Sequence, residues 1–245
     1  MTIEFAVIGG TGMTDIEGLE VTHREVVHTP YGEPSGPITH GKIGGKNIAF
    51  LARHGYTHTI PPHKINYRAN MWALHSLGVE KVVAIAAVGG ITADMQPTKL
   101  VIPDQIVDYT YGRAHTFYEE GLTHVTHIDF SWPYCPEMRQ ALLNAAQCAG
   151  IEVVPYGTYA ATQGPRLETA AEIRKLERDG CDLVGMTAMP EASLARELGL
   201  RYASCAVVAN WGAGKCDEEI SMDEIRDNLL VGMANARALL RGLVC

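Results

Sequence analysis

The chain has 245 residues, of which 47% are hydrophobic and 20% are charged, and it contains 25 glycines. This composition is typical of a globular protein with many tight turns, and we expect one α/β domain over residues 1–245. The formal net charge of −8 argues against nucleic acid and anionic membranes as partners, because both are bound through a concentrated positive field.

The cysteines and the apolar segments bear on the cellular compartment. The six cysteines form no C-x-x-C pair, and the N-terminus "MTIEFAVIGGTG" lacks a basic region of the kind that begins a signal peptide. No apolar run approaches the roughly 18 residues that a membrane span requires. We therefore expect a cytoplasmic protein with reduced thiols and no membrane partner.

Strand and helix patterns alternate along the chain. Near-continuous apolar runs predict strands, covered on both faces of a sheet, at residues 4–10, 46–53, 81–91, 99–109, 153–163, 181–187 and 201–211. Helical patterns occupy residues 65–78, 136–150, 169–180, 190–199 and 221–244. The first four of these helices end at a glycine, and Ser221 with Glu224 has the spacing of a capping box. The alternation predicts the α/β class.

The first strand runs into a glycine-rich turn, "VIGGTG". Backbone N–H groups in such a turn can hold an anion, and Thr11 adds a hydroxyl. A tight turn without a ligand is the simpler interpretation. A dinucleotide site is a third, although the turn matches neither G-x-G-x-x-G nor a Walker sequence and "TDIEGLE" after it makes a poor dinucleotide-fold helix.

The second strand ends in "LARHG". The guanidinium of Arg53 presents a planar fork of donors that matches phosphate oxygens, and His54 offers a further donor. Arg53 could instead pair with a carboxylate. His54, His58 and His63 match no zinc-binding spacing, so we expect no metal.

Residues 113–136 form the longest irregular segment and are rich in histidine and aromatic residues. A connection of this length in a compact domain is usually functional or lies at a subunit contact. A surface excursion without a role is the alternative.

Residues 162–191 join two apolar runs through Gly-Pro and a helix. Glu168 supplies a carboxylate just after a turn, Met186 a flexible apolar surface and Thr187 a hydroxyl. These groups suit a ligand with a hydrogen-bonding ring, a sugar and an anion, which indicates a nucleoside together with phosphate.

Five segments, taken together, resemble one family of enzymes. They are "VIGGTG", "TPYGEPS", "LARHGYTHTIPPHKINYRANMWAL", "TQGPRLET" and "GMTAMPEASLARELG", and the resemblance to the trimeric purine nucleoside phosphorylase and methylthioadenosine phosphorylase family extends over nearly the whole chain. It implies a twisted mixed central sheet flanked by helices and a homotrimer. It also implies phosphorolysis, in which inorganic phosphate is a co-substrate and no cofactor or metal takes part.

The resemblance also implies roles for individual residues. It assigns phosphate to Thr11, Arg53, His54, the backbone near Ala87 and Thr187, the ribose to Met186, and the base to Leu167, Glu168 and Asn210. Catalysis is then expected from Arg53 and His54, which hold the nucleophile, and from Asn210, whose amide can meet N7 and O6 of the leaving purine. A structural role for Asn210 in the core is the alternative.

Two positions bear on which purine is bound. The methylthioadenosine enzymes carry two aspartates in a segment that resembles "VVANWGAGK", where this chain has Asn210 and Gly212. Glu168 resembles the glutamate of the 6-oxopurine enzymes, because a carboxylate accepts from N1–H of hypoxanthine or guanine but faces a lone pair on adenine. A mismatch of this kind can cost about 10⁴ in selectivity.

Two further positions bear on the 5′ end of the sugar. Met222 falls near the position at which enzymes that prefer a 5′-hydroxyl place a histidine, so an apolar 5′-methylthio group is favoured. His127 resembles a residue that reaches the 5′ end from a neighbouring subunit, with a surface histidine as the alternative. Together these features predict 5′-methylthioinosine as the substrate, and hypoxanthine and 5-methylthioribose 1-phosphate as the products.

Other substrates and other classes of function remain open at this point. A general inosine/guanosine phosphorylase follows if Met222 does not face the sugar, and a methylthioadenosine phosphorylase follows if Glu168 is protonated or turned away. A nucleosidase that uses water in place of phosphate and a non-catalytic nucleoside sensor are the competing classes.

Overall fold

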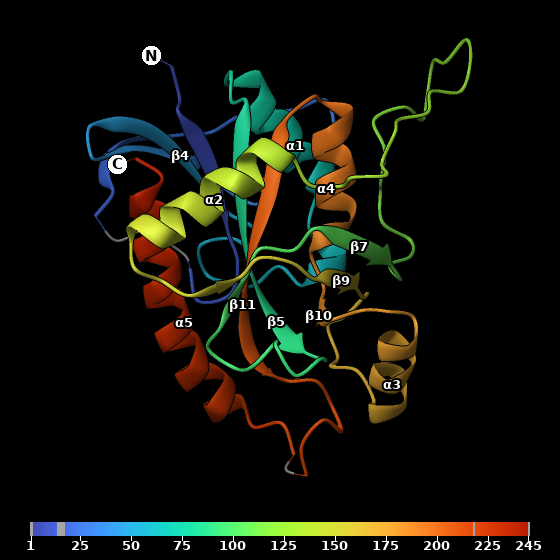
Figure 1. Ribbon diagram of the computed structural model, residues 1–245. Coiled ribbons are helices and arrows are strands. Elements are labelled where there is room, and N and C mark those ends of the chain that lie inside the picture. The colour runs from blue at the N-terminus through green and yellow to red at the C-terminus, as the bar shows by residue number, and fades with distance from the viewer. Residues whose placement is uncertain (1, 14–17, 218, 245) are drawn as a thin grey trace.

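Eleven strands of the described residues form one mixed sheet, with helices packed on both of its faces (Figure 1). The computed structural model describes residues 2–13, 18–217 and 219–244. The strands are β1 (Phe5–Gly9), β2 (Glu20–Glu25), β3 (Ile38–Ile43), β4 (Lys46–Ala52), β5 (Lys81–Gly90), β6 (Leu100–Val101), β7 (Gln105–Asp108), β8 (Val153–Val154), β9 (Thr158–Ala161), β10 (Leu183–Gly185) and β11 (Arg201–Trp211). The helices are α1 (Tyr67–Ser76), α2 (Pro136–Cys148), α3 (Ala170–Arg178), α4 (Ala188–Glu197) and α5 (Met222–Gly242), with a short 3₁₀ helix at Pro62–Lys64.

The order of the strands places the two longest of them at the centre. The main path is β2-β3-β4-β1-β5-β10-β9-β7, and β11 pairs with both β5 and β6, which in turn pairs with β8. Strands β4, β1, β5 and β11 run parallel to one another, whereas β10 is antiparallel to β5. The carboxyl ends of the four parallel strands therefore meet at one edge, which is where ligands of α/β sheets collect.

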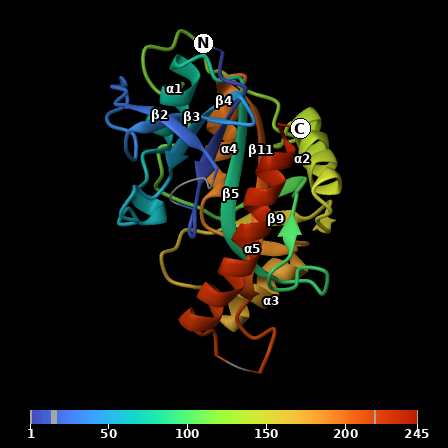
Figure 2. The same cartoon turned by 90° about the vertical axis from the view of Figure 1, so that its left-hand side faces the viewer.

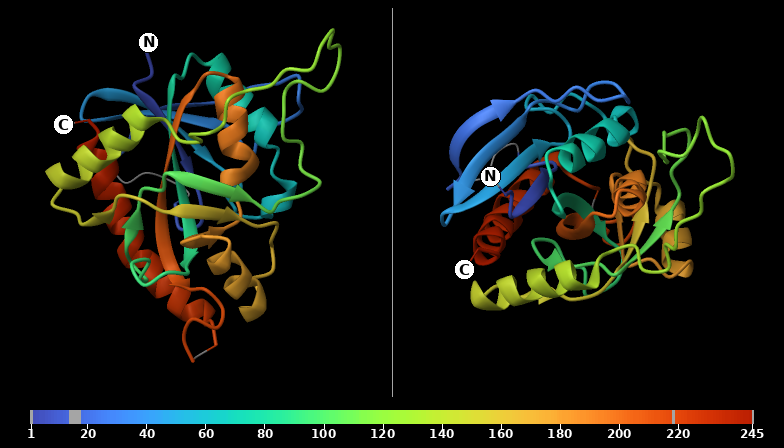
Figure 3. Two further views of the ribbon diagram at one scale, coloured as in Figure 1. Left: turned by 45° about the vertical axis from the view of Figure 1, so that its right-hand side comes forward. Right: turned by 90° about the horizontal axis from the view of Figure 1, so that it is seen from above.

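The two faces of the sheet carry separate hydrophobic clusters. In β1, Ala6 and Ile8 belong to the cluster that contains α1 and α4, while Phe5 and Val7 belong to the cluster that contains α2 and α5. This alternation follows from the period of two along a strand. Figures 2 and 3 show α5 and α2 on one side of the sheet and α1 and α4 on the other. The expected α/β class and mixed sheet flanked by helices are confirmed.

Helix ends follow the signals in the sequence. The glycines that end the first four helical patterns, Gly78, Gly150, Gly180 and Gly199, all have positive φ. The side chain of Ser221 accepts a hydrogen bond from Glu224 N at the start of α5. No helix among the described residues has the length and apolar character needed to span a bilayer.

Two predicted strands are divided in the structure, and two observed strands were not predicted. The predicted strands over 99–109 and 153–163 are each divided in two, at Pro103 and at Pro155, because proline has no N–H to donate to a ladder. Strands β2 and β3 were not predicted. Strand β2 is the edge of the sheet and is mostly polar and exposed, whereas β3 lies between β2 and β4 and its sequence ITHGKI is interrupted by polar residues, so neither has an apolar run to mark it.

Candidate active site

One cavity of about 260 Å³ lies at the carboxyl ends of the parallel strands. Its wall is formed by the ends of β1, β4, β5, β10 and β11, the loop before α3 and the first two turns of α5. Of the residues that the sequence singles out, eleven line this cavity: Thr11, Arg53, His54, Ala87, Leu167, Glu168, Met186, Thr187, Asn210, Gly212 and Met222. His127 does not line it. Residues spread over more than two hundred positions are thus brought to one place.

The turn after β1 brings Gly10 against Arg53 at the end of β4. Gly10 O accepts a hydrogen bond from Met13 N (3.0 Å), and Gly12 has a φ of +81°. A Cβ on residue 10 would lie 2.9 Å from Arg53 Nη1, so only glycine allows this approach. The segment is thus a tight turn that also lines the cavity, and residues 14–17, on which the dinucleotide interpretation partly rested, lie outside the described residues.

Arg53 is 1% exposed and forms a bidentate ion pair with Glu191, which was not foreseen as its partner. Nε and Nη2 donate to the two carboxylate oxygens (2.7 and 2.8 Å), and Nη1 donates to Ile85 O (2.9 Å). Burial alone lowers the pKa of Arg53, but the charge of Glu191 outweighs it and the net shift is upward. The predicted fork is therefore partly used within the protein, and Nη1 and Nη2 each have a second N–H for a ligand.

His54 follows Arg53 into the cavity wall with a defined tautomer. Its Nδ1 lies 2.8 Å from Ile60 O, and a carbonyl only accepts, so Nδ1 carries the proton. Burial, together with the positive charge of Arg53, lowers the pKa of His54 to about 4. The ring is consequently neutral near pH 7, and Nε2 is an acceptor. This differs from the expectation that His54 supplies a second donor to phosphate.

The loop from β10 into α4 supplies Met186 and Thr187. Thr187 is the N-cap of α4, and its hydroxyl accepts no hydrogen bond from the first turn of that helix. Met186 packs beside Gly164, where a Cβ would lie 2.3 Å from Met186 Sδ. Because Gly164 also has a φ of +61°, only glycine suits this position.

The carboxylate of Glu168 is oriented by a neighbouring hydroxyl. Thr162 Oγ1 donates to Glu168 Oε1 at 2.7 Å. Glu168 also borders a second, smaller cavity of about 190 Å³, whose wall includes Tyr109, Arg166 and Lys175. One carboxylate oxygen is thereby fixed by the protein, and the other is free to accept from a ligand.

The end of β11 supplies Asn210 and Gly212. Asn210 Nδ2 donates to Trp211 O at 2.7 Å, so one amide hydrogen is used by the backbone and Oδ1 with the second hydrogen remains for a ligand. A Cβ on residue 212 would lie 3.1 Å from Ile173 Cδ1 and 3.2 Å from Gly90 O. The packing at residue 212 thus leaves little room for an aspartate.

The first two turns of α5 add an apolar wall that the sequence interpretation did not include. Ile225 and Leu229 line the cavity together with Met222 and with Ile220 just before the helix. Positions 222, 225 and 229 share one face of a helix, and this spacing was the available signal. Met222 itself is 70% exposed and lies at the rim.

Comparison with known proteins agrees with this geometry. The model of the phosphorylase superfamily matches residues 4–244. The chain belongs to this superfamily. A probable S-methyl-5′-thioinosine phosphorylase of Pseudomonas syringae pv. tomato is 52% identical over 98% of this chain and 97% of the relative.

Two further relatives carry different names. A 6-oxopurine nucleoside phosphorylase of Pyrococcus furiosus is 51% identical over 90% of this chain and 84% of its own length. Among solved structures, a methylthioadenosine phosphorylase of Schistosoma mansoni in complex with adenine matches with a TM-score of 0.95 at 33% identity, covering 99% of this chain and 91% of that one. The chain is thus a nucleoside phosphorylase of the purine type, as expected from its sequence.

His127 of this phosphorylase lies in the irregular segment between β7 and α2, is exposed, and does not contact its own cavity. Figures 1 and 3 show this segment projecting from the body of the chain. His127 is therefore not part of the wall of its own cavity, and a role in a neighbouring subunit stays a prediction.

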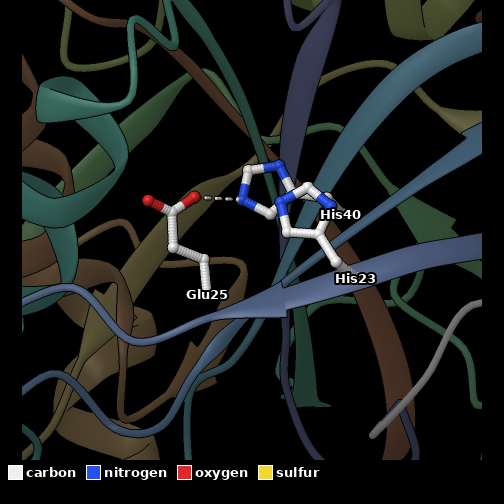
Figure 4. Close-up of side chains that lie close together, drawn as sticks. All are labelled: His23, Glu25 and His40. Carbon is white, nitrogen blue, oxygen red and sulfur yellow. Dashed lines mark ion pairs between the residues drawn. The ribbon is translucent and has the colours of Figure 1, made fainter.

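One group of potential metal ligands occurs elsewhere in the described part of the phosphorylase. His23, Glu25 and His40 on β2 and β3 have ligating atoms within 4.8 Å of one another (Figure 4). The two imidazoles are stacked, with centroids 4.3 Å apart and planes at 3°. Lone pairs that lie in two parallel planes cannot both point at one ion about 2.1 Å away, so this arrangement does not form a metal site. The absence of a metal in the reaction stays a prediction.

Two buried residues of the phosphorylase were not identified from the sequence. Glu191 holds Arg53, and Arg113 lies behind the cavity wall with several backbone partners. Glu191 stands inside a helical pattern and Arg113 at the start of an irregular segment, so neither had a local signal. Their partners are 138 and about 50 to 76 residues away in the chain.

Proposed function

We propose that this protein catalyses the phosphorolysis of S-methyl-5′-thioinosine, with hypoxanthine and 5-methylthioribose 1-phosphate as products. The observation that carries the proposal is the cavity of about 260 Å³, because it joins anion-binding groups, the carboxylate of Glu168 with the amide of Asn210, and an apolar wall from α5. The relative from Pseudomonas syringae pv. tomato, which bears this name and is 52% identical, supports it.

The phosphate end of the cavity combines one fixed positive charge with hydroxyl donors. Arg53 cannot change rotamer without breaking its ion pair with Glu191, so its remaining N–H groups are pre-organised for an anion. Thr11 and Thr187 add hydroxyls to the same wall. His54 Nε2 accepts, and hydrogen phosphate can donate its P–OH to it. The anion is thereby held for attack on C1′ of the sugar.

The base end is selective through hydrogen bonding. Glu168, with one oxygen held by Thr162, accepts from N1–H of a 6-oxopurine. The second amide hydrogen of Asn210 donates to the purine as negative charge accumulates on it. Adenine offers a lone pair at N1 in place of a donor, so a buried polar group would be left unpaired.

The sugar end is selective through burial of apolar surface. A 5′-methylthio group placed against Ile225, Leu229 and Met222 loses contact with water, and one such group is worth about 1 to 3 kcal/mol in discrimination. A 5′-hydroxyl in the same place would find no hydrogen-bond partner on this helix face. The apolar wall thus favours the methylthio nucleoside over inosine.

A comparison of substrates tests the proposal directly. We expect kcat/KM to be highest for methylthioinosine, with methylthioadenosine and inosine well below it, in assays that contain phosphate. Base release should stop when phosphate is omitted. Full activity in phosphate-free buffer would establish a nucleosidase instead, and a clear preference for methylthioadenosine would contradict the roles given to Glu168 and Asn210.

One observation favours a second candidate. Met222 is 70% exposed, so the rim of the cavity is open and a 5′-hydroxyl there could remain solvated. This would suit a general 6-oxopurine nucleoside phosphorylase, the name carried by the relative from Pyrococcus furiosus. Equal kcat/KM for inosine and methylthioinosine would decide for this alternative.

The assembly and compartment belong to the same proposal. We infer a cytoplasmic homotrimer in which His127 of one subunit reaches the 5′ end of the sugar in the next. Residues 119–127, all exposed, belong to the segment that projects from the body of the chain, which supports this arrangement (Figure 1). No cofactor or metal is required, because phosphate is the nucleophile and the protein supplies only positioning and hydrogen bonds.

A further inference from the structure

Arg113 lies near the start of the irregular segment between β7 and α2, yet it is only 8% exposed. Its Nε donates to Gln163 Oε1 at 3.1 Å. Its Nη2 donates to Thr162 O (3.2 Å) and Gln163 O (2.9 Å). Its Nη1 donates to Met186 O (2.8 Å) and Met189 O (2.6 Å), with Tyr67 Oη at 3.3 Å. Every N–H of the guanidinium thus has an acceptor within the protein.

The four carbonyls belong to the two loops that carry the substrate-binding side chains. Thr162 and Gln163 directly follow β9 and lead into the loop with Glu168. Met186 and Met189 stand on either side of Thr187, at the start of α4. One planar group therefore ties the base-binding loop to the loop that binds ribose and phosphate.

Arg113 does not itself line the cavity, and it has no donor left for a ligand. Its contribution is therefore indirect. A guanidinium holds its acceptors in one plane with fixed angles, which a lysine ammonium does not. Thr162 adds a second link, because its backbone is held by Arg113 while its hydroxyl holds Glu168.

We propose that Arg113 is a positioning residue for phosphorolysis: it sets the distance between the base-binding carboxylate and the groups that hold ribose and phosphate. The inference rests on the proposed function. Nucleophile, sugar carbon and leaving base must be aligned at once, and a misplacement of 1 Å can cost about 10²-fold in rate. Loss of Arg113 should therefore lower kcat more than it raises KM.

Arg139 is a matched control for this test. It also ties loops through backbone carbonyls, donating to Pro103 O (2.8 Å), Ile102 O (3.2 Å) and Pro155 O (2.6 Å), and it does not line the cavity. We expect Arg113→Ala and Arg139→Ala to lower the melting temperature, while only Arg113→Ala lowers kcat, by about 10²-fold. An equal loss of activity in both variants, or a folded Arg113→Ala with kcat within about twofold of wild type, would overturn the proposal.

Two further measurements guard against ambiguity. Free guanidinium at a sub-denaturing concentration should restore part of the kcat that Arg113→Ala loses. It should not raise the kcat of wild type. Where the alanine variant does not fold, Arg113→Lys takes its place, and kcat within about twofold of wild type in that variant would equally overturn the proposal.

Amide hydrogen exchange separates this inference from the proposed function. Exchange should rise in residues 162–168 and 185–190 together in the Arg113 variant, and in neither segment in Arg139→Ala. Unchanged exchange contradicts the positioning role whatever the substrate. A wild-type protein that releases no base in the presence of phosphate contradicts the proposed function alone, because the exchange result does not depend on activity.

Discussion

At the scale of single residues, the candidate site depends on side chains whose protein partners fix what they can offer a ligand. Arg53 donates three of its N–H groups to Glu191 and Ile85 O. His54 Nδ1–H donates to Ile60 O, and one oxygen of Glu168 accepts from Thr162. Each group is therefore pre-organised, and little reorganisation is needed when the substrate binds. From the residue types alone, more hydrogen-bond donors would be expected to face the ligand than the cavity offers, because several are already bonded within the protein.

Substrate choice at Glu168 is testable by a single atom change. Glu168→Gln replaces an acceptor with an amide that can donate to N1 of adenine, and Thr162 can still donate to the remaining oxygen. We expect the ratio of kcat/KM for methylthioinosine over methylthioadenosine to fall by about 10² or more. Glu177→Gln makes the same chemical change on the outer surface of α3, where Glu177 pairs with Lys215, and should leave the ratio unchanged. An unchanged ratio in Glu168→Gln would place Glu168 outside the base site.

The low pKa of His54 predicts a dependence of stability on pH. The folded protein holds the pKa at about 4, below the ordinary value of 6.5 that applies to the unfolded chain. The unfolded state therefore binds the proton more readily, and the contribution of this group is complete above pH 6.5 and lost as the pH falls toward 4. The loss between pH 7.5 and pH 5 should be about 2 kcal/mol in the free energy of unfolding.

Replacement of His54 isolates this effect. His54→Asn keeps a donor for Ile60 O but does not titrate, so its free energy of unfolding should fall less between pH 7.5 and pH 5 than that of wild type. Urea unfolding at the two pH values measures the difference, with the exposed His75→Gln as control. Equal acid sensitivity in His54→Asn and wild type would show that another group is responsible.

At the scale of elements, the loops that follow the strands decide the geometry of the cavity, and glycine decides the path of the loops. The turn after β1 needs Gly10 to approach Arg53, and the loop after β9 needs Gly164 to pass Met186. The helices contribute mainly through their first turns, because α4 begins at Thr187 and α5 begins at the apolar rim. Glycines at these points set the path of the loops, whether they line the cavity, as Gly10 does, or do not, as Gly164.

The effect of a glycine on the path of a loop can be measured at Gly164. Gly164→Ala must place a methyl group 2.3 Å from Met186 Sδ at a φ of +61°, so we expect a loss of about 1 to 3 kcal/mol in the free energy of unfolding. Gly78→Ala has a comparable φ of +76° but no atom within 4 Å of the added Cβ, and it isolates the backbone contribution. Denaturant unfolding should show Gly164→Ala to be the less stable of the two. Equal losses would mean that Met186 moves aside at no cost.

At the scale of the whole molecule, a long mixed sheet brings distant segments to one edge while leaving one predicted site residue outside. The cavity draws on the chain from Gly10 to Leu229. His127, by contrast, is exposed and does not line the cavity, and the segment between β7 and α2 that carries it projects from the body (Figure 3). In the proposed trimer each cavity would be completed by the next subunit.

Mixed trimers test this shared site. His127→Ala and Asn210→Ala should each have low activity alone, the first through the neighbouring cavity and the second through its own. When they are co-expressed at equal amounts, about a quarter of the sites combine an intact cavity with an intact neighbour, so activity should rise toward about a quarter of wild type. Activity that stays at the average of the two single variants would show that His127 does not act across the interface.

Local patterns in the sequence were enough to predict the α/β class and the long helices with their caps and glycine ends. Turns directly after strands pointed to Thr11 and Arg53, and the resemblance to the phosphorylase family supplied others of the eleven predicted residues that line the cavity, such as Asn210. Strand β2 was missed because a polar edge strand has no apolar run to mark it, and the buried strand β3 was missed because polar residues and a glycine interrupt its sequence ITHGKI.

How the site residues are engaged by the protein depends on the folded chain and could not be predicted. Glu191 for Arg53, Ile60 for His54, and the two loops tied by Arg113 depend on contacts between segments that are separate in the chain or on the local path of a loop. The amino-acid type of a residue does not tell whether its hydrogen-bond donors are free or already bonded within the protein. What it can give to a ligand is set by which acceptors the fold places around it, and that is a property of the packed molecule.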